Sequence, residues 1–312
     1  LSRESRKILI TAWIEDWTEV VTSTICDDYG QNGDPIVIKN RSELMAFLSD
    51  PKKNTQGSVA IIQPLEIDLD PSEDQVWPSD DYTLSATLNL AGSTLKTSHR
   101  LFKRMTSSAN LVNGKVMIKD GTENLQCAIA LCNDGTIERV NVVTSGEDSQ
   151  VKASLAGLVG INRGTIYQCS STLPVYGTEA FNVKISETES YSLNFVGGIA
   201  AASATKASTL MSVIDGCTVN ASVNGSEDIG GGGGIVGYAL GRVTNNTFEY
   251  GITVKQGTKF KNIVGAVAGL SATEDKQLRA YGNAWPTLAP NNFSAVENAN
   301  NYPGTKFNAV ID

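Results

Sequence analysis

A short phrase recurs through the second half of the chain, and this repetition constrains the fold more than any other feature. Its clearest copy is residues 156–166 (AGLVGINRGTI), where glycines bracket an apolar pair, an Asn-Arg-Gly turn follows, and a β-branched step ends the phrase. Related copies begin near Ala128, Val196, Gly234 and Val264. Each copy is too small to bury its apolar residues alone, so the copies must stack on one another.

The spacing of the copies predicts the register of this stack. Ile137, Ile166, Ile214 and Val243 occupy equivalent places, at intervals of 29, 48 and 29 residues. Short alternating segments separated by turns favour parallel strands stacked about 4.8 Å apart. The long interval contains residues 181–193, which we expect to leave the stack as an excursion such as a hairpin. The pattern predicts an all-β fold: a right-handed parallel β-helix, or solenoid, with irregular excursions.

Two other repeat architectures fit the sequence less well. A leucine-rich horseshoe would need an L-x-x-L-x-L phrase, which the chain lacks. A propeller would need repeats large enough for four-stranded blades. The shorter units found here favour the β-helix.

The region before the repeats predicts a cap at the start of the stack. A helix is expected over residues 42–48, with Ser42 as the N-cap and with Leu44, Phe47 and Leu48 on one face. Such a helix would cover strands that are otherwise unpaired at the open end. Short strands are predicted at residues 36–38, 59–62, 65–69, 82–84, 86–90, 93–95, 101–102 and 116–118.

Two domains are expected. Residues 1–33 contain a predicted strand at 7–13 and a linker, and they could be the end of a preceding domain. Residues 34–312 form the β-helix domain, with a closing segment at the C-terminus. The first residue is not Met and no signal peptide is seen, so we expect a processed form.

Composition agrees with short strands and disfavours several partners. The chain of 312 residues has 29 Gly and only 19% charged residues, which suits strands and turns better than helices. The net charge is −8, without a dense run of Lys or Arg, so we expect no nucleic-acid partner. No apolar run approaches the roughly 18 residues of a transmembrane helix, so we expect no span in this chain.

Cysteines and asparagines recur at equivalent places in the copies. Cys169 and Cys217 each lie three residues after an equivalent isoleucine, so they should stack as small buried side chains. A disulfide between neighbouring turns is the alternative. Asn133 and Asn162 are predicted corners, where left-handed backbone is tolerated and the side-chain amides can stack. The spacing of the five cysteines suits neither a zinc site nor a disulfide scaffold.

One glycine-rich segment matches a nucleotide-binding pattern only formally. Residues 232–237 read G-x-G-x-x-G, but residues 238–242 lead to another turn instead of a helix. A dinucleotide site needs a strand before the motif and a helix after it. We therefore expect no organic cofactor, and we interpret the glycines as a tight or flexible turn.

An acidic stretch provides the best chemical candidates. Asp68, Asp70 and Asp74 are candidate Ca²⁺ ligands, because carboxylate oxygens suit a hard cation. Glu73 stands where an EF-hand loop needs glycine, so a solvated acidic loop is the simpler interpretation. Paired carboxylates would suit glycoside hydrolysis, but 33 acidic residues offer no obvious pair. The single histidine, His99, lies in no nucleophile–base motif, so catalytic residues remain unassigned.

The repeated phrase resembles a known motif. Residues 156–160 and 234–237 resemble the GLUG motif of surface proteins from Bacteroides-type bacteria, and residues 36–78 are similar to the opening of the same solenoids. Residues 8–17 resemble the end of a fimbrillin-type domain. The step expected in relatives as D-G-x-G-x-x-I is only partly matched at residues 89–95. The resemblance covers roughly residues 36–275.

The resemblance implies a bacterial adhesin that is secreted or anchored to the outer membrane, with a lipid anchor on the precursor as one option. It brings no catalytic residues. We therefore expect a cell-surface adhesion protein that presents the solenoid flank to a glycan or protein partner. Two alternatives stay open: a polysaccharide lyase or glycoside hydrolase of the β-helix type, and a structural spacer or assembly subunit. Enzymatic activity is left open, with binding favoured.

Overall fold

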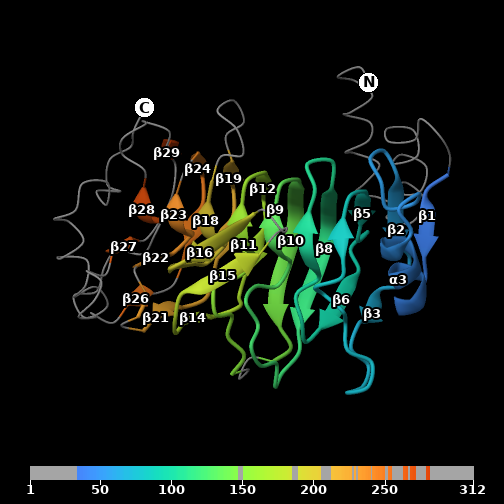
Figure 1. Ribbon diagram of the computed structural model, residues 1–312, viewed down its shortest axis with the longest axis horizontal. Coiled ribbons are helices and arrows are strands. Elements are labelled where there is room, and N and C mark those ends of the chain that lie inside the picture. The colour runs from blue at the N-terminus through green and yellow to red at the C-terminus, as the bar shows by residue number, and fades with distance from the viewer. Residues whose placement is uncertain are drawn as a thin grey trace.

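The computed structural model describes residues 34–281, with gaps at 147–149, 185–188, 205–211, 227, 230, 240, 250–251, 255–262, 266–267 and 272–278. Apart from one helix, the regular structure in these ranges is β-strand, which confirms the all-β prediction. The strands follow one another along a long body, from the N-terminal helix to the last strands (Figure 1). Within these ranges, no helix has the length and apolarity needed to cross a membrane.

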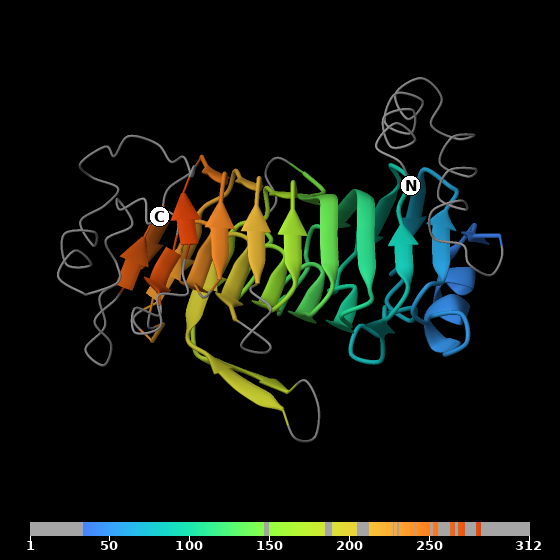
Figure 2. The same cartoon turned by 90° about the horizontal axis from the view of Figure 1, so that it is seen from above.

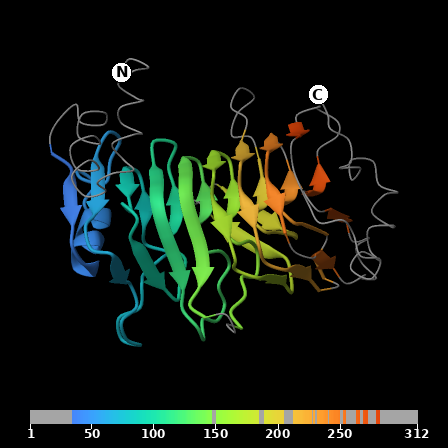
Figure 3. The ribbon, with the colours of Figure 1, turned by 180° about the vertical axis from the view of Figure 1, so that it is seen from behind.

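The largest sheet has 14 strands that pair in parallel. Its main path is β1 (Ile36–Ile38), β2 (Val59–Ile62), β5 (Thr87–Asn89), β8 (Asn110–Ile118), β10 (Thr136–Thr144), β12 (Thr165–Tyr167), β19 (Val213–Asp215), β24 (Arg242–Thr244) and β29 (Arg279–Tyr281). Beside this path lie β3 (Glu66–Asp68), β6 (Thr94–Thr97), β13 (Ser170–Ser171), β20 (Thr218–Val219) and β25 (Thr247–Phe248). From behind, parallel strands continue along the whole body (Figure 3).

The predicted register is confirmed in this sheet. Ile137 pairs with Ile166, Ile166 with Ile214, and Ile214 with Val243. All four side chains are fully buried in the main core. Each strand position predicted between residues 36 and 118 also contains or overlaps a strand.

A second parallel sheet contains the recurring phrase itself. Its seven strands are β4 (Thr83–Leu84), β7 (Phe102–Met105), β9 (Ala130–Asn133), β11 (Val159–Asn162), β18 (Ala200–Ser203), β23 (Val236–Ala239) and β28 (Ala268–Ser271). The five copies pair in register at Ala130, Val159, Ala200, Val236 and Ala268. The middle of the phrase therefore forms one strand of each layer, and its last residues begin the next strand, such as β12, in the 14-stranded sheet.

Two three-stranded parallel sheets complete the stack. One contains β14 (Val175–Gly177), β21 (Val223–Gly225) and β26 (Ile252–Val254), and the other contains β17 (Phe195–Gly197), β22 (Gly231–Gly233) and β27 (Ile263–Gly265).

The interpretation of residues 232–237 as a turn was partly wrong. Gly232 and Gly233 lie in strand β22, and the segment continues into strand β23 instead of a helix. A Cβ atom on Gly237 would lie 2.7 Å from Cβ of Phe195 and 2.7 Å from the Val196 carbonyl oxygen. Glycine is needed here for close packing between layers rather than for turning.

The predicted helix is present as α3 (Arg41–Ser49), and Leu44, Phe47 and Leu48 are buried as expected. The N-cap, however, is Asn40 and not Ser42. Asn40 has extended backbone, and its side-chain oxygen accepts a hydrogen bond from the Glu43 amide at 2.9 Å. The helix begins earlier than predicted because Asn is as good an N-cap as Ser and lies ahead of it.

One left-handed residue lies at the same corner of successive layers. The five residues directly after registered strand positions have φ of 60°, 52°, 51°, 65° and 56°, and they are Asn113, Arg139, Gln168, Gly216 and Asn245. A single αL residue breaks the extended run and turns the chain to its next segment. The corner therefore recurs in position while its residue type varies.

The prediction for Asn133 and Asn162 is confirmed in one part and wrong in another. Their amides stack, with Asn133 Nδ2 donating to Asn162 Oδ1 at 2.9 Å, and both side chains are buried. They end strands β9 and β11, however, and neither has positive φ. Their amides bond to backbone groups of the following turn, so side-chain hydrogen bonding explains these residues.

The cysteine prediction is confirmed for the described residues. Cys169 and Cys217 are buried and free, as are Cys127 and Cys132, so the disulfide alternative is wrong for them. Cys26, the strand predicted at residues 7–13 and the closing segment after residue 281 lie outside the described residues.

The excursion is an antiparallel hairpin made of β15 (Phe181–Lys184) and β16 (Ser190–Leu193), with Phe181 paired to Leu193. Seen from above, it stands out from the side of the stack (Figure 2). The hairpin predicted within residues 181–193 is therefore confirmed with the same boundaries.

Candidate functional site

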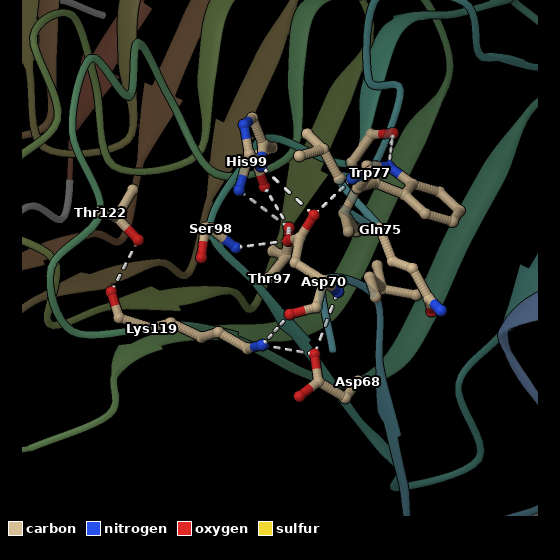
Figure 4. Close-up of polar contacts among 12 residues, drawn as sticks. Asp68, Asp70, Gln75, Trp77, Thr97, Ser98, His99, Lys119 and Thr122 are labelled. Carbon is tan, nitrogen blue, oxygen red and sulfur yellow. Dashed lines mark hydrogen bonds and ion pairs between the residues drawn. The ribbon is translucent and has the colours of Figure 1, made fainter. Parts of the chain in front are cut away.

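Asp70 organises the corner that follows β3, where the sequence predicted chemistry (Figure 4). Its side chain is only 6% exposed. One carboxylate oxygen, Oδ1, accepts the Trp77 amide, while Oδ2 accepts Thr97 Oγ1 at 2.9 Å and the Ser98 amide at 2.7 Å. These donors hold the carboxylate in one orientation.

His99, the only histidine of the chain, lies against this carboxylate (Figure 4). Its Nδ1 atom is 3.3 Å from Asp70 Oδ1 and is buried, although the contact lacks hydrogen-bond geometry. The imidazole as a whole is 41% exposed. A carboxylate that accepts a hydrogen bond from one ring nitrogen orients a histidine for general acid–base chemistry, and here the two groups are adjacent without that bond.

Of the other predicted acidic residues, Asp68 adjoins this corner, and its Oδ1 atom accepts the Asp70 amide at 3.0 Å. Lys119 Nζ lies 2.5 Å from Asp68 Oδ1 and donates to the Asp70 carbonyl oxygen at 2.5 Å. Asp74 is exposed. Among the residues that the structure describes, no group of three or more His, Cys, Asp or Glu is placed to hold a metal ion. The geometry adds no support to the Ca²⁺ site predicted at Asp68, Asp70 and Asp74.

A second polar cluster lies beneath the hairpin, centred on the fully buried carboxylate of Asp134. Arg163 binds it through two hydrogen bonds, Nε to Oδ1 at 2.6 Å and Nη2 to Oδ2 at 3.0 Å. Arg104 donates to Oδ2 from Nε at 2.9 Å and from Nη2 at 2.5 Å. Burial raises the pKa of Asp134, but hydrogen bonds from Arg163 and Arg104 outweigh it and hold the pKa below its usual value.

The same arginine connects the stack to the hairpin. Arg163 Nη1 pairs with Glu189, which precedes β16, and also donates to Tyr191 Oη at 3.1 Å. Tyr191 Oη donates to Glu189 Oε1 at 2.9 Å. Burial raises the pKa of Glu189, but its hydrogen bonds from Arg163 and Tyr191 hold the pKa below its usual value. We call Arg104, Asp134, Arg163 and Glu189 the ionic foot of the hairpin.

Apolar contacts complete the attachment. Val183 and Leu193 are buried against a second hydrophobic cluster, separate from the main core. On the stack, this cluster includes Cys132, Ile161 and Ala202, which pair in register across β9, β11 and β18. Burial raises the pKa of the Cys132 thiol to about 12. The hairpin therefore covers an apolar strip on the outside of the seven-stranded sheet.

The hairpin presents a polar outer face. Asn182, Lys184, Ser190 and Ser192 are exposed, and in β15 the exposed side chains alternate with the more buried Phe181 and Val183. At its base, the rings of Phe195 and Tyr238 pack 5.7 Å apart, and both are partly exposed. Aromatic and polar side chains thus meet around one docked projection.

Sequence reasoning missed the ionic foot. Asp134 and Arg163 directly follow Asn133 and Asn162, which pair in register, so their opposite charges occupy equivalent positions of neighbouring copies. That signal was available in the sequence. Glu189 carried no such signal, because it lies inside the excursion, where no repeat predicts its position.

The fold and site define an all-β protein of stacked parallel sheets with a docked hairpin. No protein family model matches the chain, and no curated protein matches its sequence. In structure, the chain is similar to a protein from Bacteroides ovatus described as a "putative immunoglobulin A1 protease", with 14% sequence identity and a TM-score of 0.43. The similarity covers 82% of this chain and 76% of that one. A likeness this distant carries no inference about activity.

Proposed function

We propose that the stack is a right-handed parallel β-helix of the GLUG-motif type, with α3 as its N-terminal cap. Three observations support this architecture. Equivalent residues pair in parallel between copies, a left-handed residue recurs at the same corner of the four copies whose corner is described, and the copies contribute strands to several sheets. Buried side chains along the copies form one continuous core. In stacked repeats, each copy is stabilised by its interfaces with the neighbouring copies.

We infer that the protein is an adhesion or interaction protein of a bacterial cell surface, with a glycan or a protein as its partner. The observation that carries this proposal is the docked hairpin at residues 181–193. It contributes nothing to the regular stack, yet an ionic foot and an apolar strip hold it in place. Excursions on a rigid scaffold are where repeat proteins commonly place binding residues.

Binding should be measured on a glycan array and a protein array, with a matched turnover assay on pectin-like and host polysaccharides. We expect a bound partner and no released product. Replacing Asn182, Ser190 and Ser192 together by Glu should abolish binding, because three carboxylates would cover the outer face of the hairpin. Thr218→Glu, on the 14-stranded sheet, is the control and should bind normally. Product release together with unchanged binding by the triple variant would contradict the proposal.

The proposed location follows from the same inference. An adhesin has to be displayed outside the cell, on the outer membrane or secreted. Antibody labelling of intact producing cells tests this directly. Labelling only after the cells are lysed would overturn the cell-surface assignment.

A hydrolase is the second candidate, favoured by one observation. Asp70 is oriented by three donors and lies beside the exposed imidazole of His99. If this pair acts as a general base, His99→Gln should abolish any turnover found in the polysaccharide assay. Thr122→Ala, nearby on the same surface, is the control (Figure 4). Equal turnover by His99→Gln and the native chain would exclude His99 as the base.

A further inference from the structure

The main-chain edges of the hairpin set it apart from the strands of the stack. In the described part of the chain, β15 and β16 pair with each other and form a two-stranded sheet. A strand within the stack, such as β11, has a neighbour on each side. Edge strands present rows of backbone N–H and C=O groups that can pair with another extended chain.

We propose that the hairpin binds an extended segment of a partner protein, which adds to β15 or β16 as a third strand. This inference rests on the proposed interaction function and specifies its partner class. Only an extended polypeptide backbone carries the alternating donors and acceptors that a strand edge complements. A glycan would instead have to be recognised by side chains.

The hairpin is anchored to the stack by side chains, which favours such binding. Its inward residues Val183 and Leu193 are buried, and Arg163 holds Glu189 at the start of β16. A partner strand therefore meets a preformed edge, and less conformational entropy is lost when it binds. Asn182, Ser190 and Ser192 have small, uncharged and exposed side chains, and Lys184, which pairs with Ser190, places the one charged side chain of this face at the far end of β15.

The surroundings of the hairpin indicate which segment would fit. Tyr191 is 37% exposed, and Phe181, Phe195 and Tyr238 are partly exposed around the hairpin base. Four-residue strands allow few main-chain hydrogen bonds, so side-chain contacts must add affinity. Aromatic residues supply much of the binding energy at protein interfaces. The fitting partner is an extended segment with apolar side chains at alternate positions.

The test begins with a phage-displayed library of short random peptides selected on the full chain. The tightest peptide is then resynthesised with one backbone nitrogen methylated at a time. Each methyl group removes one donor, so strand addition predicts about tenfold weaker binding at every second nitrogen and little change between. Failure to select any peptide, or losses that do not alternate along the peptide, would overturn the proposal.

Variants of the chain locate the edge. Asn182→Ala and Ser192→Ala should retain peptide binding, because the main chain is unchanged, whereas Asn182→Pro or Ser192→Pro should abolish it. The alkylation rate of Cys132, which the hairpin covers, checks that the proline variants keep the hairpin docked. Loss of peptide binding in both alanine variants would overturn main-chain recognition.

Two further outcomes separate this inference from the proposed function. Binding on the glycan array together with no peptide binding would overturn strand addition and leave the adhesin proposal standing. A concentration-dependent dimer that Ser192→Pro abolishes would also overturn it, since the occupant would then be a second copy. If neither a glycan nor a protein binds, both proposals fail.

Discussion

At the scale of single residues, the corner of each layer shows how backbone conformation and residue type can disagree. Gln168, Arg139 and Asn245 adopt left-handed backbone at the place where Gly216 does so in another layer. Left-handed backbone at a residue with a Cβ atom costs the folded state roughly 1–2 kcal/mol, whereas glycine carries no such cost. Some corners therefore store strain that packing of the neighbouring layers offsets.

Replacing Gln168 by Gly should stabilise the chain by about 1 kcal/mol, because the strain disappears. Gly216→Ala should have the opposite sign and a similar size. A Cβ atom there would have ordinary contacts, with its nearest neighbour, Gln168 Cγ, at 3.4 Å, so its cost reflects backbone conformation alone. Urea denaturation measures the stability change in both variants. Stability changes of the same sign in Gln168→Gly and Gly216→Ala would contradict the strain argument.

The buried carboxylate of Asp134 gives a second prediction at this scale. Asp134→Asn should lower the free energy of unfolding by about 3 kcal/mol, because the Arg163 guanidinium, which is 4% exposed, loses its buried counter-charge. Glu138→Gln is the matched control, since Glu138 pairs with Arg139 at the surface, and it should change stability by less than about 1 kcal/mol. Equal losses of unfolding free energy in the two variants would show that burial does not strengthen the interactions of Asp134.

At the scale of elements, the hairpin behaves as a unit attached to a completed sheet. Its inner face packs on residues that pair across β9, β11 and β18, and its ionic foot joins side chains from β7, from the residues after β9 and β11, and from the residue before β16. No described strand of the stack pairs with it. Its attachment therefore depends on side chains, and charge makes that attachment sensitive to acid.

Stability should fall in acid through Asp134 and Glu189. Both carboxyl groups have a pKa below the usual value in the folded chain. The stabilisation is thus complete above the unfolded pKa of about 4 and is lost as the pH falls through the folded pKa. As the pH is lowered from about 6 to about 2, the urea concentration at the midpoint of unfolding should decline. This decline should be shallower in the Asp134→Asn variant. An identical slope in both proteins would contradict the linkage.

At the scale of the whole molecule, stability is propagated from layer to layer. The inner strands of the two large sheets have a parallel neighbour on each side, and the main core runs from Ile38 to Ala268. Repeat proteins of this kind lose their least-connected parts first. The hairpin is such a part.

Hydrogen exchange measures the difference in local stability between the hairpin and the stack. Amides of β15 and β16 should exchange faster than those of β11, because the hairpin can detach without opening the stack. Glu189→Gln should speed exchange in the hairpin and leave β11 unchanged. Equal protection of hairpin and stack in the native chain would mean that they open together.

Several features were predictable because they are periodic. The pairing of Ile137, Ile166, Ile214 and Val243 followed from spacing alone, since identical phrases must take identical places in a stack. The hairpin boundaries followed because an insertion between equivalent positions has to leave the stack. The buried cysteines followed from the same equivalence. A periodic sequence therefore reveals which distant residues pair, because equivalent positions can be found from the spacing of the copies.

By itself, the sequence determined the all-β class, the register and the place of the excursion. Only the tertiary structure decided what the excursion does: it covers Ile161 and fastens Glu189 to Arg163, residues far apart in the chain. It also placed the left-handed residue at Gln168 and not at the predicted Asn162, and it brought His99 next to Asp70. The physical reason is that each repeat packs against the equivalent residues of the next repeat, so its neighbours can be read from the spacing. A segment outside the repeat contacts residues that become its neighbours only when the chain has folded.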